Sequence, residues 1–281
     1  MVTRALSGLV MGTLIGAALF FGGRDGYALF VAAVAAVACY EGLRLVITDA
    51  GPAERVTPLI LVVILFGLFY RPGDPLPMAG VAVYLGASLA YRLLDRSQSL
   101  TNWSWGVAVA LYVGWLGGHA VALRDFDPGL LMPGRGFLEA LPDQARSAGV
   151  IWTLLAFTIT WANDTAAYLV GRVWGRRPLA ASISPNKTWE GTVGGWIFSV
   201  LAAVVWGGIL GLSIPPVIVL GALVGPVATG GDLVVSHLKR RAGVKDTSRL
   251  IPGHGGALDR IDSLLFTVPL VYYWLLWAPG A

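Results

Sequence analysis

Residues 214–238 read IPPVIVLGALVGPVATGGDLVVSHL, an apolar stretch that runs into a polar segment at its end. A helix needs about 20 apolar residues to cross the hydrocarbon core of a bilayer, and this stretch supplies them. The whole chain of 281 residues is 56% hydrophobic and 13% charged. A soluble domain carries about 25% charged residues. The sequence therefore predicts an integral membrane protein and excludes a soluble globular domain.

Eight further stretches have the same character, so nine spans are expected in total. Because lipid offers no partner for unpaired backbone groups, the spans must be helices, and a closed barrel would need an alternation that these runs lack. The predicted fold class is all-α, a polytopic helical bundle in one continuous membrane domain. Within it we distinguish N-terminal helices with an outward-facing loop (1–148) from a C-terminal region with the polar motifs (149–281). The expected spans are 5–22, 27–48, 57–70, 78–94, 103–123, 149–172, 190–211, 214–238 and 262–278.

The distribution of Lys and Arg predicts the orientation of the bundle, because cytoplasmic loops of membrane proteins are enriched in these residues. With nine spans, the N-terminal side carries fifteen of the 20 Lys and Arg residues and the other side carries five. We therefore expect the N-terminus and both polar motifs described below to face the cytoplasm. The connection 124–148 should face outward, and it shows no arrangement suited to chemistry.

The first polar motif, residues 231–262, holds four carboxylates, six Lys or Arg residues and a glycine-rich turn between two apolar segments. If the eighth helix continues through its start, residues three or four apart share a face. That face presents a carboxylate, a hydroxyl and two cations, which are Asp232, Ser236, Lys239 and Arg240. Orientation in the membrane requires only basic residues, so the interleaved carboxylates indicate a functional site.

The end of this motif favours a site for a hard cation and phosphate. Asp259 and Asp262 lie three apart at the start of the ninth expected helix, where they can share a divalent cation with Asp232. Residues 252–256 read PGHGG, which is unsuited to a helix interior and can offer backbone N–H groups to oxygens. Mg²⁺ fits this donor set best, since it prefers carboxylates, water and substrate phosphate. Zinc fits less well, because the chain has only three His residues and its one Cys is remote.

The second polar motif spans residues 163–191. Asp164 lies inside an apolar span, where a charge costs about 2.5–3.5 kcal/mol and therefore needs a partner or a cavity. Arg172, Arg176 and Lys187 gather where the chain leaves the membrane, a place suited to a phosphate group or to anionic headgroups. Three further residues have both a local and a substrate-binding interpretation, namely Ser184 as a turn residue, Thr188 as an N-cap and Glu190 at a helix start.

Other polar residues have simpler interpretations. Glu41 and Arg44, three apart in the second span, are interpreted as an ion pair within one helix. Arg92 is interpreted as an orientation signal, and Cys39 as a small packing residue. No role is assigned to His237.

Together the two motifs resemble a known family. The first motif closely resembles the signature of phosphatidate cytidylyltransferases, also called CDP-diacylglycerol synthases. The residues that match are Ser236-x-Leu238-Lys239-Arg240-x4-Lys245-Asp246-x5-Pro252-x-His254-Gly255-Gly256-x2-Asp259-Arg260-x-Asp262. Asp164 to Gly175 and Ser184 to Gly191 also resemble that family. The match covers residues 164–262, whereas the first 150 residues are similar only as spans. Two positions depart from the usual pattern, Ala257 and Ser248.

The resemblance implies an enzyme, a nucleotidyltransferase of phospholipid biosynthesis, in which phosphatidic acid and CTP give CDP-diacylglycerol and pyrophosphate. It implies Mg²⁺, with room for a monovalent cation such as K⁺, held by Asp232, Asp259 and Asp262. The expected catalytic group is Asp232, Lys239, Arg240, Lys245, Asp246, Asp259 and Arg260. Asp246 either positions Lys239 or Arg240 or joins the metal site. The expected substrate-binding group is Asp164, Arg172, Ser184, Lys187, Glu190, Ser236, His254, Gly255 and Gly256.

The same resemblance implies a multi-pass protein of the cytoplasmic membrane and a homodimer, with membrane lipid but no nucleic acid among its partners. Competing interpretations remain. A CDP-archaeol synthase or a polyprenol kinase would keep a similar site with another acceptor. A transporter would place Asp164 in ion coupling but should show two symmetric broken helices, which the sequence lacks. A purely structural membrane protein would not need the interleaved carboxylates and cations.

Overall fold

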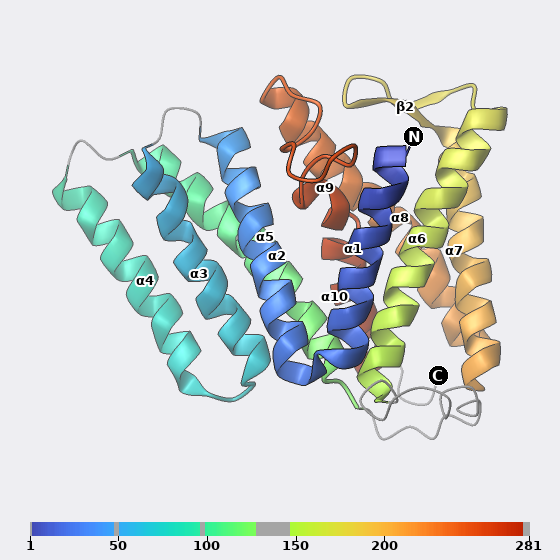
Figure 1. Cartoon of the computed structure of the whole chain (residues 1–281), viewed down its shortest axis with the longest axis horizontal. Coiled ribbons are helices and arrows are strands. Elements are labelled where there is room, and N and C mark those ends of the chain that lie inside the picture. The colour runs from blue at the N-terminus through green and yellow to red at the C-terminus, as the bar shows by residue number, and fades with distance from the viewer. Residues whose placement is uncertain (1, 48–50, 96–98, 128–146, 278–281) are drawn as a thin grey trace.

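The computed structural model describes residues 2–47, 51–95, 99–127 and 147–277. Each of the nine expected spans corresponds to a helix, so the all-α prediction is confirmed in its main feature (Figure 1). The long helices are α1 Val2–Phe21, α2 Gly23–Val46, α3 Pro52–Tyr70, α4 Pro75–Leu94, α5 Leu100–Arg124, α6 Ala148–Trp174, α7 Trp189–Leu210, α8 Ile214–Arg241 and α10 Leu264–Trp277. Within the described residues, five of them are long and apolar enough to cross a membrane: α2, α4, α5, α7 and α8.

The helices pack around two hydrophobic cores. One core joins α2, α3 and α5 through residues such as Leu43, Leu61 and Val113, and it also takes in Leu258 and Leu265. The other core joins α6, α7, α8 and α10. Helix α10 contacts α5, α6 and α8, so it connects the two cores. Residues from the far C-terminal part of the chain therefore complete the core of the N-terminal helices.

The closest helix contacts use small residues, as is usual where lipid provides no hydrophobic drive for association. Helices α6 and α7 pack along Gly191, Gly194 and Gly195, where an added Cβ would overlap α6 atoms such as the carbonyl oxygen of Ala167. At the start of α7 the Thr188 hydroxyl accepts a hydrogen bond from Gly191 N–H at 3.2 Å. The predicted N-cap at Thr188 is therefore confirmed.

Two features depart from the expected bundle. The link between α6 and α7 forms a short antiparallel hairpin of β1 Pro178–Ala180 and β2 Ser184–Thr188, so Ser184 lies in a strand. The ninth expected span, 262–278, corresponds to α10, and a separate four-residue helix, α9 Leu258–Ile261, precedes it. The hairpin, α9 and the start of α1 lie at one end of the bundle (Figure 1). Most of the outward-facing loop expected at 124–148 falls outside the described residues.

Candidate active site

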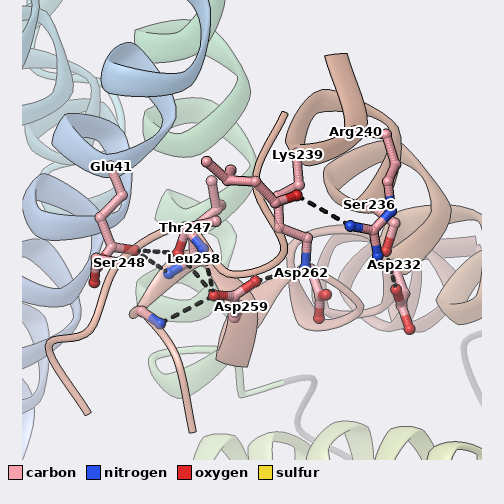
Figure 2. A network of polar contacts seen from close by, with 12 residues as sticks. Glu41, Asp232, Ser236, Lys239, Arg240, Thr247, Ser248, Leu258, Asp259 and Asp262 are labelled. Atoms are coloured by element: carbon pink, nitrogen blue, oxygen red, sulfur yellow. Dashed lines mark hydrogen bonds and ion pairs between the residues drawn. The ribbon is translucent and has the colours of Figure 1, made fainter. Parts of the chain in front are cut away.

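A buried ion pair lies at the centre of the polar end of the bundle. Lys239 near the end of α8 donates to Asp259 of α9, with Nζ 2.6 Å from Oδ1. The other carboxylate oxygen, Oδ2, accepts from the backbone N–H and hydroxyl of Thr247 and from the N–H of Gly256 (Figure 2). Both oxygens of Asp259 therefore have partners, and its carboxylate ties α8 to the segment 242–257 that leads to α9.

The contacts of Asp259 favour its ionised form. Burial raises the pKa of a carboxyl group, but the hydrogen bonds from Gly256, Lys239 and Thr247 oppose this effect and lower the pKa of Asp259 below its usual value. A buried carboxylate held in this way is a fixed negative charge at neutral pH. It fixes the ammonium of Lys239 in place, where that group can hold an anion beside it.

A second buried carboxylate reaches this segment from the N-terminal half of the chain. Glu41 of α2 is 3% exposed, and its carboxylate accepts from the hydroxyl of Ser248 at 2.6 Å. The Thr247 hydroxyl lies 2.9 Å from both Glu41 Oε2 and Asp259 Oδ2, so its single proton is shared between the two carboxylates. The Glu41 oxygens also accept from the backbone N–H groups of Ala257 (3.1 Å) and Leu258 (2.9 Å) at the start of α9. A helix N-terminus with free N–H groups is a favourable environment for a negative charge.

The interpretation of Glu41 as an ion-pair partner of Arg44 is therefore wrong, because its carboxylate faces the segment 247–258 instead. Gly256 makes this approach possible, since a Cβ at that position would overlap the Glu41 carboxylate. The sequence held one signal for Glu41: it is an acidic residue within an apolar span, where a charge is costly unless it has a function or a partner.

The predicted glycine turn is present. Gly253 and Gly255 have φ values of +77° and +81°, which non-glycine residues rarely adopt, and Ile251 pairs with Gly255 in an isolated bridge. His254 sits on this turn with Nδ1 2.8 Å from the hydroxyl of Ser7 on α1. The same hydroxyl lies 2.9 Å from the carbonyl oxygen of Pro252. The turn is thus held by α1 on one side and by α2 on the other.

The turn forms one wall of a basic cavity of about 610 Å³. Its polar lining includes the side chains of Lys245, Arg249, Arg260 and His254, together with the carboxylate of Asp246. Three permanent cations beside a glycine turn make this cavity suited to a polyanion such as a string of phosphates. Arg249 was not among the predicted site residues, although it lies in the same basic run.

Three further carboxylates gather on α6, α8 and the α9–α10 junction. Asp164, Asp232 and Asp262 lie near enough for their charges to interact. Asp232 accepts from Ser236 at 2.9 Å and pairs with Lys187 of the hairpin, Nζ to Oδ2 2.7 Å. The predicted continuation of the eighth helix, with Asp232 and Ser236 on one face, is therefore confirmed. Lys187 supplies a positive charge to this acidic group.

The acidic group suits a hard cation in its chemistry. Among the described residues no three His, Cys, Asp or Glu side chains converge closely enough to enclose a metal ion. Mg²⁺ does not require such a cage, because proteins usually bind it through one or two carboxylates with water and substrate phosphate. Asp232 and Asp262 provide two such carboxylates, and Asp164 lies nearby. The residues present therefore fit a magnesium ion shared with a phosphate-bearing ligand.

Two other predicted residues, Arg240 and Glu190, form hydrogen bonds with backbone groups around the site. Arg240 donates to the carbonyl oxygens of Ile183 (3.1 Å) and Val244 (3.0 Å), so it holds the hairpin against the end of α8. Glu190 accepts from the backbone N–H groups of Arg176 (3.0 Å) and Arg177 (3.2 Å). Arg172 is exposed and lies 3.3 Å from the hydroxyl of Tyr168.

The prediction that Asp246 positions Lys239 or Arg240 is wrong. Lys239 pairs with Asp259, and Arg240 is held by backbone carbonyl groups. Asp246 is exposed and lines the basic cavity instead. Whether it contacts a metal ion stays a prediction.

Comparison with known proteins gives consistent matches. The family model described as "Cytidylyltransferase family" matches residues 2–277. The phosphatidate cytidylyltransferase of Synechocystis sp. is 34% identical over an alignment 287 positions long, which covers 95% of each chain. That of Brucella melitensis is 32% identical over 276 residues, 96% of this chain and 91% of the relative. That of Haemophilus influenzae is 43% identical over 131 residues, 44% of this chain and 46% of the relative.

Proposed function

The chain belongs to the cytidylyltransferase family, and we propose that it transfers a cytidylyl group from CTP to phosphatidic acid in phospholipid biosynthesis. The products are CDP-diacylglycerol and pyrophosphate. The observation that carries this proposal is the basic cavity lined by Lys245, Arg249 and Arg260, which lies at the same end of a lipid-exposed bundle as the acidic group. A triphosphate and a lipid phosphate can meet there.

The reaction brings two anions together, and the protein must reduce their repulsion. An oxygen of the phosphatidic acid phosphate attacks the α-phosphorus of CTP, and the bond from that phosphorus to the bridging oxygen of the β-phosphate breaks. The electron pair leaves with pyrophosphate. A phosphate monoester is already nucleophilic near neutral pH, so no side chain has to form a covalent bond.

We assign the cations of the site by their position. Lys245, Arg249 and Arg260 hold the β- and γ-phosphates and the leaving pyrophosphate in the basic cavity. Lys239, fixed by Asp259, faces the charge that develops during transfer. Lys187 exchanges its contact with Asp232 for the lipid phosphate, and Arg172 assists at the exposed edge.

Mg²⁺ belongs to this proposal, with Asp232 and Asp262 as the residues that would hold it. When bound, the ion neutralises charge on the phosphate oxygens. A monovalent cation such as K⁺ is the second ion that family resemblance implies. Asp259 was expected as a direct ligand, and its four hydrogen-bonding contacts favour the role of fixing Lys239 and the segment 247–256 instead.

The placement in the membrane is also proposed. Nine spans with the N-terminus in the cytoplasm put the basic cavity and the acidic group at the cytoplasmic face of the inner membrane. The support is the excess of Lys and Arg on that side, fifteen of 20. We also propose that the protein forms a homodimer, as the family resemblance implies.

A substrate panel tests the function. Purified protein is incubated with CTP, dCTP, ATP or no nucleotide, and with phosphatidic acid, an unsaturated archaeal-type lipid phosphate or a polyprenol as acceptor. We expect CTP and phosphatidic acid to give the fastest formation of a nucleotide-linked lipid, and Asp232→Asn to remove most of it. Faster turnover of the polyprenol would identify a kinase, and faster turnover of the archaeal-type lipid would identify another acceptor; either result would overturn the proposal.

A further inference from the structure

Helix α4 carries a buried arginine at the edge of the bundle. The helix packs against α3 at one edge of the molecule, and only 6% of its most apolar segment is buried (Figure 1). Arg92 is nevertheless 9% exposed, and it is the one buried residue of α4. An arginine that only signals orientation extends its charged end to water or headgroups. Arg92 turns inward instead.

The buried guanidinium keeps an unpaired donor in the part of the chain that the structure describes. Its Nε atom is buried without a hydrogen-bond acceptor. A buried polar group without a partner costs about 1–3 kcal/mol, and more when the group is charged. Such a group at the edge of a membrane bundle indicates that an anion from outside the chain binds there.

Arg92 lines a cavity of about 590 Å³ between α3 and α4. The lining is mixed, since Tyr84 and Ser88 lie with the exposed apolar side chains Ile60 and Val83. A cavity of this size falls in the range of ligand sites. Its apolar side opens to lipid, so the ligand has a polar head next to a hydrocarbon part, as a phospholipid does.

A carboxylate on the other side of the same cavity defines the headgroup. Glu54 near the start of α3 lines it, and its Oε2 accepts from the side-chain amide of Asn102 at 3.2 Å. The positive charge of Arg92 and the negative charge of Glu54 cancel, so the lining of this cavity has no net charge. A purely anionic headgroup would meet the repulsion of Glu54, whereas a zwitterionic one satisfies both groups.

We propose that the cavity between α3 and α4 binds the headgroup of an aminophospholipid such as phosphatidylethanolamine. The phosphate pairs with Arg92 and the ammonium group with Glu54. This site is separate from the basic cavity, because it is built by α3 and α4 instead of by α8, α9 and the segment between them. Its ligand is not the proposed substrate, since phosphatidic acid carries no ammonium group.

Lipid binding to delipidated protein, measured by native mass spectrometry, tests the proposal. The ligands are phosphatidylethanolamine, phosphatidylglycerol, phosphatidylcholine and inorganic phosphate. We expect phosphatidylethanolamine to bind at least about tenfold more tightly than the other three. Phosphatidylglycerol and inorganic phosphate have no ammonium group for Glu54, and the quaternary ammonium of phosphatidylcholine has no N–H to donate to it. Equal binding of phosphatidylglycerol, or full competition by inorganic phosphate, would overturn the proposal.

Variants separate this site from other lipid contacts. Arg92→Gln should weaken phosphatidylethanolamine binding at least about tenfold, and Glu54→Gln should remove the preference over phosphatidylglycerol. Arg71→Ala is the control, because Arg71 follows the other end of α3 and is exposed. Unchanged binding by Arg92→Gln, or an equal loss in Arg71→Ala, contradicts the proposal. If Arg92→Gln does not fold, thermal unfolding of the unmodified protein provides the test. A higher unfolding temperature with phosphatidylethanolamine but not with phosphatidylglycerol supports the proposal, and equal shifts contradict it.

Discussion

The carboxylate of Glu41 accepts a hydrogen bond from the backbone N–H of Leu258 at 2.9 Å, across 217 positions of sequence. Through this contact and three others, α2 holds the start of α9 and the segment before it. Asp259 follows directly and fixes Lys239 from the same short helix. The N-terminal helices therefore help to position the site, although the motifs that the sequence analysis identified lie only in residues 164–262.

We predict that Glu41→Gln disturbs the site almost as much as Glu41→Ala. Each carboxylate oxygen accepts one backbone N–H, from Ala257 or from Leu258, so an amide must turn its NH₂ group toward one of these donors. We expect each variant to lose about 2–4 kcal/mol of unfolding free energy and most of its activity. Thermal unfolding in detergent and CTP turnover measure these effects.

Asp25→Asn is the matched control for Glu41, because Asp25 is a carboxylate at the opposite end of α2. It should leave turnover within about twofold of the unmodified protein, as expected for a surface change. A Glu41→Gln protein with normal stability and activity would show that the contacts at α9 are not needed.

Lys239 and Asp259 should behave as a coupled pair. Breaking a buried ion pair leaves a charge without a partner and costs about 3–5 kcal/mol. The side chains of Lys239 and Asp259 are 11% and 4% exposed, so the cost of breaking a buried ion pair applies to them. We predict that Lys239→Met and Asp259→Asn each destabilise the protein, and that the double variant loses less than the sum of the two. Unfolding free energies of the four proteins measure the coupling, and strict additivity would contradict the pairing.

Two adjacent glycines of α8 should differ sharply. An added Cβ at Gly231 would lie 2.6 Å from the carbonyl oxygen of Asp262, whereas one at Gly230 meets nothing within 4 Å. Gly231→Ala should therefore push α8 away from the α9–α10 junction and reduce activity at least about tenfold, given the sensitivity of catalysis to small displacements. Gly230→Ala should keep activity and gain about 0.5–1 kcal/mol of stability. Similar turnover of the two variants would exclude a close approach at Gly231.

Metal removal tests the acidic group. Dialysis against EDTA should abolish turnover and Mg²⁺ should restore it. Binding of Mn²⁺, followed by electron paramagnetic resonance, should weaken at least about tenfold in Asp232→Asn, since a carboxylate ligand is lost. Asp74→Asn serves as control, because Asp74 caps the start of α4 away from this group. Turnover that survives thorough chelation would refute the metal proposal.

Much of this architecture follows from local sequence patterns. Apolar runs predict the helices because each must satisfy its own backbone in lipid. The continuation of α8 to Arg241, the N-cap at Thr188 and the turn at Gly253 and Gly255 depend on neighbouring residues, and all three were predicted correctly. The hairpin at 178–188 was missed, because its strands are short and carry no clear alternation.

Pairings between distant residues could not be read from the sequence. Six basic residues in 231–262 and several in the second motif could have met the carboxylates. Only the folded chain singles out Lys239 for Asp259 and Lys187 for Asp232. The role of Glu41 depends on α2 packing beside α9, which no local pattern encodes. Arg92 looked like an orientation signal because its burial depends on how α4 turns against α3.

The most direct test of the central claim follows the phosphates of CTP. The purified protein is given phosphatidic acid and Mg²⁺ with CTP labelled at the α-phosphate, and in a parallel reaction with CTP labelled at the γ-phosphate. Cytidylyl transfer predicts that the α label enters the lipid and that the γ label is recovered in pyrophosphate. Label from the γ-phosphate in the lipid, or no lipid labelling that depends on phosphatidic acid, would contradict the account.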